Sequence, residues 1–278
     1  MGRVFDALQQ AKAQGGRDPQ PAWDPASYDD SDLRHRTHTP EPVPGNAGIL
    51  ALNANPENRL VVLDENDSPG AERFRFLASQ LAMAQKSRLL KTVLITSSAT
   101  GEGKSVISAN LALSMAKYAG QHTLLVDGDP RHASLTGCFS PGATAGVAEW
   151  LREPHRLSGI AKRHAALPFW FLPASRSQVT DPRLQSDALL HALSSVAGSF
   201  ESVIIDSPPL VLADAAIWMA AVEGCLLVSR QGKTSIKEMS KALTLVPRAK
   251  LLGVILNDWD DYTHKYYHQY YRAKAQPD

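Results

Sequence analysis

The sequence predicts an α/β fold in which a mostly parallel β-sheet carries helices on both faces. Three observations lead to this prediction. Short, continuously apolar segments recur along the chain, helical segments lie between most of them, and the first apolar segment runs into a loop of small residues. Strands that are apolar throughout are typical of parallel sheets, because both faces of each strand are buried. The expected strands are Thr92–Thr96, Thr123–Asp127, Phe169–Pro173, Ser202–Asp206, Leu226–Ser229 and Leu251–Leu256.

Length and composition fit such a fold. The chain has 278 residues, of which 44% are hydrophobic, enough to bury a substantial core in one or two domains. The net charge of +1 gives no general attraction to nucleic acid, so no nucleic-acid partner is expected. Cys138 and Cys225 form no C-x-x-C pair, which favours reduced, buried thiols over a disulfide framework. Neither a secretory signal nor a membrane-spanning apolar run is present, so we expect a cytoplasmic protein.

The two ends of the chain differ in composition from its centre. Residues 1–13 are expected to form a short amphipathic helix, and the proline-rich residues 14–48 a disordered linker. The globular domain is expected to span residues 49–259, followed by a flexible, tyrosine-rich tail at 260–278. A helix joined to the domain by a flexible linker could serve as a docking element. The equally plausible alternative is that residues 1–13 fold back onto the domain.

Two helices are expected around the first strand. One spans residues 71–86 and the other runs from Val106 to Tyr118. The first helix places four apolar side chains on one side: Phe74, Leu77, Leu81 and Ala84.

The loop between the first strand and its following helix has the sequence of a phosphate-binding P-loop. It reads Ser-Ser-Ala-Thr-Gly-Glu-Gly-Lys-Ser from Ser97 to Ser105, and it has Ser98 where the usual motif has glycine. Backbone N–H groups in such a loop surround phosphate oxygens, and the helix N-terminus adds its positive end. The lysine reaches the β- and γ-phosphates, and the serine hydroxyl binds Mg²⁺. The expected nucleotide-binding residues here are Thr100, Gly101, Glu102, Gly103, Lys104, Ser105 and Val106.

Carboxylates end two further strands. Asp127 and Asp129 follow one strand, and Asp206 ends another. A buried carboxylate is costly unless it is paired or binds a metal, and a neighbouring phosphate site indicates Mg²⁺. We expect Asp206 to bind Mg²⁺. Of Asp127 and Asp129, one is expected to bind Mg²⁺ as well, and the other to orient an attacking hydroxyl and accept its proton. The alternative is that one of the three only caps a helix or a turn, and Asp129-Pro130 is turn-like.

The three motifs together resemble the Walker A, Walker A′ and Walker B motifs of bacterial tyrosine kinases. The matching segments are Ser97–Ser105, Leu124–Arg131 and Val203–Pro209. The resemblance implies a MinD/ParA-like P-loop fold, ATP and Mg²⁺ as cofactors, and autophosphorylation linked to exopolysaccharide synthesis. It implies catalytic roles for Lys104, Asp127, Asp129 and Arg131, and metal binding by Ser105, Asp129 and Asp206.

Two residues at later strand ends are also expected to bind the nucleotide. Asn257 follows Leu251–Leu256, where the resembling family has an asparagine near the adenine. A strand-ending asparagine in a turn is the alternative. Arg230 follows Leu226–Ser229 and is expected to line the same pocket.

The last segment of the chain concentrates tyrosines. Five of the seven tyrosines fall there: Tyr262, Tyr266, Tyr267, Tyr270 and Tyr271. The resemblance implies that this cluster is phosphorylated in trans by another copy of the chain. The alternative is an aromatic contact between subunits.

The resemblance also implies partners. A separate membrane-spanning polysaccharide chain-length protein is expected to activate the kinase and to recruit it to the inner face of the membrane. A homo-oligomer is expected for trans-phosphorylation, although the family's Glu-x-x-Arg-x-x-Arg motif has Ala78 in place of its second arginine. The Walker A′ motif also departs from the family, with Pro130 and His132.

Three other functions compete with a kinase. A MinD- or ParA-like positioning ATPase would commonly carry an extra lysine early in the P-loop, and residues 97–103 contain none. A scaffold that only binds nucleotide would not need Lys104, Ser105, Asp127 and Asp206 together. A nitrogenase-type iron protein would use cysteines to hold a cluster between subunits, whereas Cys225 reads as a buried apolar residue.

Overall fold

A computed structural model of the chain describes residues 47–50, 59–63, 68–88, 90–174 and 182–258. The expected N-terminal helix and the tyrosine-rich tail lie outside these residues, as does nearly all of the expected linker. The expected domain organisation therefore stays a prediction. Within the described part, no helix is long and apolar enough to cross a membrane.

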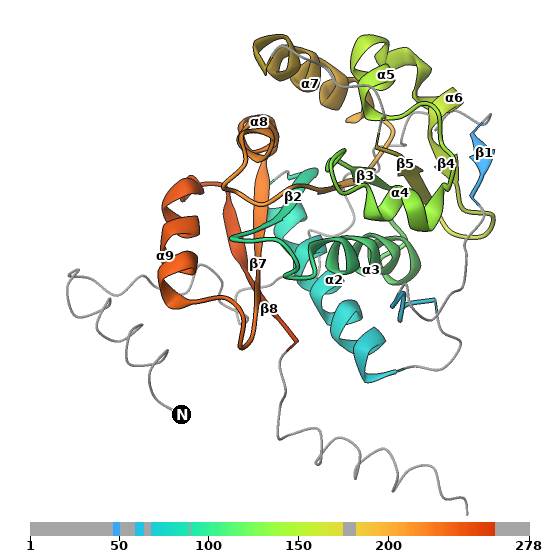
Figure 1. Cartoon of the computed structure of the whole chain (residues 1–278). Helices are drawn as coiled ribbons and strands as arrows, with labels where there is room; N and C mark the ends of the chain where they lie inside the picture. The colour runs from blue at the N-terminus through green and yellow to red at the C-terminus, as the bar shows by residue number, and fades with distance from the viewer. Residues whose placement is uncertain (1–46, 51–58, 64–67, 89, 175–181, 259–278) are drawn as a thin grey trace, which may run out of the picture. The chain divides into compact units, whose positions relative to one another are not determined.

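The centre of the structure is an eight-stranded sheet with the order β1-β4-β5-β3-β6-β2-β7-β8 (Figure 1). The pairs are parallel, except that β4 and β5 are antiparallel. This confirms the predicted mostly parallel α/β sheet. The strands are β1 (Gly48–Ile49), β2 (Thr92–Ser97), β3 (Thr123–Asp127), β4 (Lys162–Arg163), β5 (Phe169–Leu172), β6 (Ser202–Asp206), β7 (Gly224–Arg230) and β8 (Leu251–Asn257).

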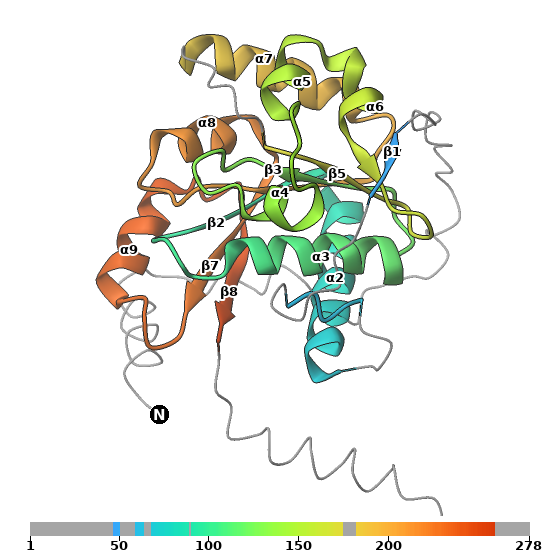
Figure 2. The same cartoon turned by 45° about the vertical axis from the view of Figure 1, so that its right-hand side comes forward.

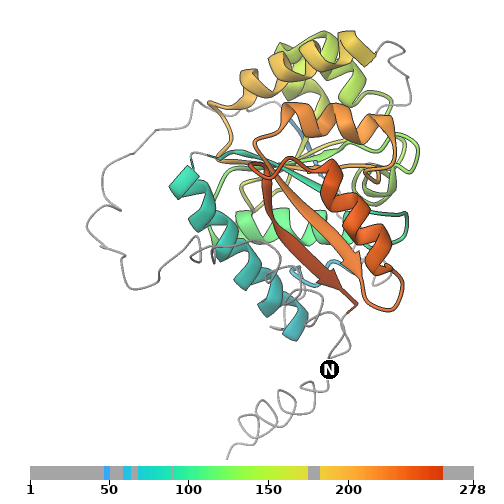
Figure 3. The same ribbon diagram turned by 90° about the vertical axis from the view of Figure 1, so that its left-hand side faces the viewer.

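Helices cover both faces of the sheet, as Figures 2 and 3 show. One apolar cluster packs under α2, α3 and α4, and a second packs under α5 to α9. Each face of the central strands is therefore buried, as their continuous apolar sequences predict. The helices are α2 (Pro69–Arg88), α3 (Lys104–Tyr118), α4 (Ser134–Phe139), α5 (Val147–Arg152), α6 (Leu157–Ile160), α7 (Pro182–Val196), α8 (Ala213–Ala221) and α9 (Ile236–Leu245), with a 3₁₀ turn at Pro154–Arg156.

The outer strands differ from the predictions. The sequence of β8 reads as a buried strand, but Val254 and Leu256 are 49% and 46% exposed. The reason is that β8 lies at the edge of the sheet, where β7 is its only neighbouring strand among the described residues. At the opposite edge, β1 and β4 were missed, because two residues are too few to show a strand pattern.

The strand order brings three carboxyl ends together. In the register of the sheet, Ile95 of β2 lies beside Asp206 of β6, and Asp127 of β3 lies on the other side of Asp206. Ligands in open parallel sheets bind at this edge. The fold therefore places the P-loop and both acidic motifs next to one another.

Candidate nucleotide and catalytic site

Two glycines allow the P-loop to turn into α3. Gly101 and Gly103 have φ angles of 73° and 92°, a backbone region that favours glycine. A Cβ atom on Gly103 would lie 2.1 Å from Asn257 Nδ2, so no other residue fits without a shift of that side chain. The helix begins at Lys104, two residues earlier than predicted, which places the lysine at its N-terminus.

The side chain of Glu102 is buried beneath the P-loop. Its carboxylate accepts hydrogen bonds from Ser98 N at 3.0 Å, Ser98 Oγ at 2.9 Å and Ala99 N at 3.2 Å. Thr234, in the loop between β7 and α9, donates a fourth hydrogen bond through its hydroxyl. The Ser98 hydroxyl thus has a structural role at the position where the usual motif has glycine. Because the Glu102 side chain points into the protein, any contact of this residue with a phosphate would come from its backbone.

Asn257 and Arg230 both contact the P-loop. Asn257 Nδ2 donates to the Glu102 carbonyl at 2.9 Å, and Arg230 Nη1 donates to the Gly101 carbonyl at 3.3 Å. Arg230 also forms a salt bridge of 2.7 Å with Asp258, a partner that the sequence analysis missed. The two residues predicted to bind nucleotide are therefore next to the loop, with part of their hydrogen-bonding capacity used within the protein.

Lys104 and Asp206 lie together under the loop, and both are buried. Burial lowers the pKa of Lys104, while the carboxylates of Asp206, Asp129 and Glu102 oppose this effect. Burial raises the pKa of Asp206 to about 7, and repulsion from Asp127 adds to the rise. Hydrogen bonds from the hydroxyls of Ser105 and Ser108, the second at 3.1 Å, and the charge of Lys104 act in the opposite direction.

Asp127 is the second buried carboxylate with a raised pKa. Burial raises the pKa of Asp127 to about 6, against hydrogen bonds from Thr136 and the Asp129 backbone. Thr136 donates from its backbone N–H at 2.8 Å and from its hydroxyl at 2.7 Å. The sequence analysis missed Thr136, which stands nine positions after Asp127 on the short helix α4.

Asp129 forms the turn that its Asp-Pro sequence indicates. Its Oδ1 accepts hydrogen bonds from Arg131 N at 3.2 Å and His132 N at 3.1 Å. The Arg131 side chain points to α8, where its Nε lies 3.0 Å from Asp214 Oδ2. The turn leaves the Asp129 carboxylate near enough to Lys104 to affect the pKa of that lysine.

The oxygen atoms at this site fit Mg²⁺. The raised pKa of Asp206 indicates a carboxylate whose charge the protein itself does not fully compensate. Mg²⁺ binds through one or two carboxylates together with substrate phosphates and water, rather than in a cage of protein ligands. Asp206 and the Ser105 hydroxyl are the residues that would hold the ion.

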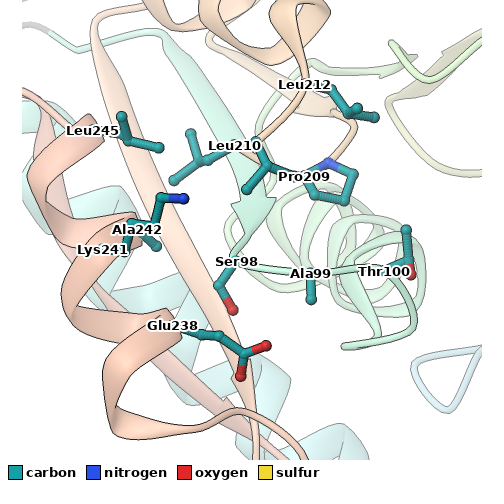
Figure 4. Close-up of a pocket in the computed structure, with 11 residues that line it drawn as sticks. Ser98, Ala99, Thr100, Pro209, Leu210, Leu212, Glu238, Lys241, Ala242 and Leu245 are labelled. Atoms are coloured by element: carbon teal, nitrogen blue, oxygen red, sulfur yellow. The ribbon is translucent and has the colours of Figure 1, made fainter.

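A pocket of about 430 Å³ opens beside the P-loop, between α9 and the loop from β6 to α8. Figure 4 shows α9 side chains across from the residues that follow β6. Most of the wall is apolar, and Glu238, Lys241 and the P-loop contribute its polar groups. The lining residues are Ser98, Ala99, Thr100, Pro209, Leu210, Val211, Leu212, Glu238, Lys241, Ala242 and Leu245.

Comparison with known proteins agrees with this geometry. The family profile of the CobQ/CobB/MinD/ParA nucleotide binding domain matches residues 93–277. The tyrosine-protein kinase YwqD of Bacillus subtilis is 30% identical over 216 residues, which cover 75% of this chain and 91% of YwqD. The tyrosine-protein kinase CpsD of Streptococcus pneumoniae serotype 4 is 35% identical over 182 residues, which cover 64% of this chain and 80% of CpsD.

Solved structures of kinases are also similar. The chimerical protein CapA2B2 matches with a TM-score of 0.67 and 27% identity, over 78% of this chain and 94% of the chimera. The kinase domain of the Escherichia coli tyrosine kinase ETK matches with a TM-score of 0.64 and 25% identity, over 71% of this chain and 79% of that domain. The chain therefore belongs to the CobQ/CobB/MinD/ParA nucleotide-binding family and, within it, to the bacterial protein-tyrosine kinases.

Proposed function

We propose that the protein is an ATP- and Mg²⁺-dependent autokinase that phosphorylates the tyrosine cluster of another copy of itself. The observation that supports this most is the register of the sheet, which places Asp127 beside Asp206 and both beside the P-loop. Two buried carboxylates with raised pKa values at a phosphate-binding edge favour phosphoryl transfer over nucleotide binding alone.

Each residue of the site has a role in this proposal. Lys104 and the N-terminus of α3 bind the β- and γ-phosphates of ATP. Asp206 and Ser105 would hold Mg²⁺, which would supply positive charge to neutralise the phosphates. Asp127 or Asp129 orients the tyrosine hydroxyl and accepts its proton. The tyrosine oxygen forms a bond to the γ-phosphorus while the bond to the ADP oxygen breaks. Asp127, with a pKa of about 6, is a suitable acceptor near neutral pH.

The surroundings of the site support a tyrosine as the acceptor. The pocket beside Thr100 and Pro209 has apolar walls that suit an aromatic ring (Figure 4). The tyrosine-rich tail follows Asp258, and Asp258 pairs with Arg230, which contacts the P-loop backbone. The described part of the chain therefore ends close to the P-loop. The proposal takes the tyrosine-rich tail of a second copy as the substrate.

We further propose that the kinase regulates polysaccharide synthesis or export with a membrane-spanning chain-length protein as its activator. The succinoglycan biosynthesis transport protein ExoP of Rhizobium meliloti supports this proposal. It is 31% identical over 231 residues, which cover 76% of this chain but 29% of ExoP. In this proposal the chain-length protein recruits the kinase to the inner face of the membrane.

The test uses the full chain with labelled ATP and Mg²⁺, with and without the cytosolic segment of the partner. We expect phosphotyrosine on residues 262–271, detected by mass spectrometry, and its loss in Lys104→Met. The matched control is Lys237→Met, which removes an exposed lysine of α9 and is expected to leave the reaction unchanged. Label on a tagged Lys104→Met chain mixed with wild type would show transfer in trans.

A different result would favour a different function. Release of phosphate without any phosphotyrosine, together with ATP-dependent dimerisation, would support the positioning ATPase that the family profile also covers. Tight ATP binding with neither turnover nor transfer would support a nucleotide-binding scaffold.

A further inference from the structure

The helix α8 contacts the Walker A′ loop, which comprises residues 127–131. Two side chains of α8 make these contacts: Asp214 in its first turn and Trp218 one turn later. Residues four positions apart lie on the same side of a helix, so both reach the same loop. We propose that Asp214 and Trp218 are positioning residues, which hold the Walker A′ loop in the geometry that phosphoryl transfer requires.

Trp218 holds the centre of the loop. Its indole Nε1 donates a hydrogen bond of 3.1 Å to the Gly128 carbonyl in the protein interior. On the other side, Gly128 N donates to the Asp206 carbonyl at 2.7 Å. Gly128 is thus fixed between α8 and the strand that carries Asp206.

The space around Gly128 shows how close this contact is. A Cβ atom at this position would lie 2.8 Å from both the Asp206 carbonyl oxygen and Trp218 Cε2. Real Cβ atoms do not approach other atoms so closely, so the glycine and the tryptophan fit only as a pair. Trp218 and the Asp206 backbone of β6 therefore both require glycine at position 128, between the two aspartates of the Walker A′ motif.

Asp214 holds the end of the loop. Its Oδ2 lies 3.0 Å from Arg131 Nε, and the two side chains are 32% and 62% exposed. A carboxylate in the first turn also interacts favourably with the helix dipole, which is the alternative reason for its presence. An interaction with the helix dipole does not require the Asp214 side chain to point toward Arg131, whereas the observed contact does.

These contacts bear on catalysis because Gly128 separates Asp127 from Asp129. Any shift of Gly128 moves both carboxylates relative to Asp206, and a displacement of about 1 Å in an active site can lower a rate about 100-fold. The helix itself is anchored at its other end, where Lys250 Nζ donates to the carbonyls of Met219 and Ala220 at 2.9 Å each. The helix is therefore a fixed support for the loop.

The main test compares two substitutions of the same kind. Trp218→Phe removes the indole N–H that binds Gly128, and Trp170→Phe is its matched control. Both tryptophans are 6% exposed and belong to the same apolar cluster, but Trp170 Nε1 has no hydrogen-bond partner among the described residues. We expect Trp218→Phe to lower kcat about tenfold while KM for ATP changes less than about twofold, because the P-loop itself is untouched.

A second measurement separates positioning from general stability. We expect faster hydrogen exchange at the amides of Asp129 and Thr136 in Trp218→Phe than in Trp170→Phe, at matched global stability. If the two variants agree in kcat, KM and exchange, Trp218 is only a core residue and the proposal is wrong. If wild type forms no phosphotyrosine at all, the proposed function fails, whereas the exchange comparison still tests the positioning.

Asp214 is partly exposed, so its substitution should change stability little and tests the proposal separately. We expect Asp214→Asn to lower kcat about threefold to fivefold, and Asp214→Glu to restore part of the loss. The control is Glu153→Gln. The Glu153 carboxylate forms another exposed ion pair, 3.4 Å from Arg156, and lies outside α8. Equal and unchanged kcat values for Asp214→Asn and Glu153→Gln would contradict the role of Asp214.

Discussion

Two buried carboxylates at this site, Glu102 and Asp206, have opposite surroundings. Glu102 accepts hydrogen bonds from two backbone amides and two hydroxyls. Asp206 accepts from the hydroxyls of Ser105 and Ser108, and burial still raises its pKa to about 7. Both are inaccessible to solvent, so burial alone does not distinguish them.

The difference separates a structural carboxylate from one that is prepared for a ligand. A buried charge is stable when donors surround it, and Glu102 has those donors within the protein. Asp206 has the hydroxyls of Ser105 and Ser108 as donors, but burial still raises its pKa, so a cation such as Mg²⁺ would complete its surroundings. Four substitutions or conditions test this comparison, in order of decreasing effect.

The largest effect is expected from Asp206→Asn. We expect tyrosine phosphorylation to fall about 1,000-fold, because the amide cannot hold the metal or compensate the charge of Lys104. We also expect the nucleotide-free variant to melt at the same or a higher temperature at pH 8. The raised pKa of Asp206 means that, even with Lys104 beside it, the ionised carboxylate is less stable in the folded protein than a neutral group. The measurements are the rate of phosphotyrosine formation and calorimetric Tm.

The control for this variant is Asp187→Asn, an exposed carboxylate on α7. It is expected to change neither quantity. A clear fall in Tm for Asp206→Asn at pH 8 would show that Asp206 is as well satisfied as Glu102, and the comparison would not hold.

The second effect is a dependence of stability on pH. The pKa values of Asp127 and Asp206 are raised in the folded protein to about 6 and about 7, from an ordinary value of 3.8. A group whose pKa is raised on folding contributes stability at pH values below its ordinary pKa, and the contribution is lost as pH rises through the folded pKa. We therefore expect the nucleotide-free protein to lose a few kcal/mol of unfolding free energy between about pH 4 and pH 7.

Denaturant titrations at several pH values measure this loss. The curve of Asp206→Asn should be flatter than that of wild type, because one raised pKa is removed and the repulsion between Asp206 and Asp127 is lost with it. Saturation with ATP and Mg²⁺ should also flatten the wild-type curve, since bound cation favours the ionised carboxylates. Parallel curves for wild type and Asp206→Asn would exclude a raised pKa at this position.

The sequence predicted this part of the molecule unevenly. The central strands and the carboxylates at their ends were predicted, because apolar runs and strand-end aspartates are local signals. The partners that decide the state of each carboxylate were not. Thr234 satisfies Glu102 from more than a hundred positions away, and Trp218 reaches Gly128 from α8. A signal that could have indicated such partners is a polar residue soon after another strand, such as Thr234 after β7.

The P-loop also shows what the sequence does not predict. The sequence alone indicates that Glu102 belongs to a nucleotide-binding motif, and its position is predicted correctly within that loop. The direction of its side chain depends on Ser98 and Thr234, and no periodicity in the chain records that direction. Contacts between residues far apart in the sequence therefore decide whether a side chain such as that of Glu102 faces the ligand or the protein interior.

The third effect is a loss of stability in Glu102→Gln. The amide has nearly the same shape and can keep its carbonyl oxygen on the N–H groups of Ser98 and Ala99, which both bind one oxygen of Glu102. Its NH₂ group then faces the hydroxyls of Ser98 and Thr234, which must reverse from donors to acceptors. We expect a loss of about 2 kcal/mol in unfolding free energy, because hydrogen bonds to a carboxylate are replaced by weaker ones to an amide. The control is Glu201→Gln, an exposed carboxylate that accepts from His122 N at 2.8 Å, with an expected loss below about 1 kcal/mol. Equal losses would mean that burial adds nothing to the role of Glu102.

The smallest effect is expected at Ser98. Ser98→Ala removes one hydrogen bond of 2.9 Å to Glu102 and keeps the backbone donor, so we expect a loss of about 1 kcal/mol in urea unfolding. Ser98→Gly, which restores the usual motif, should cost about 0.5 kcal/mol more, through the greater freedom of the unfolded chain. In the Glu102→Gln background the cost of Ser98→Ala should differ, because the two residues act as a pair. An unchanged cost there would separate Ser98 from Glu102 and leave the serine without a structural role.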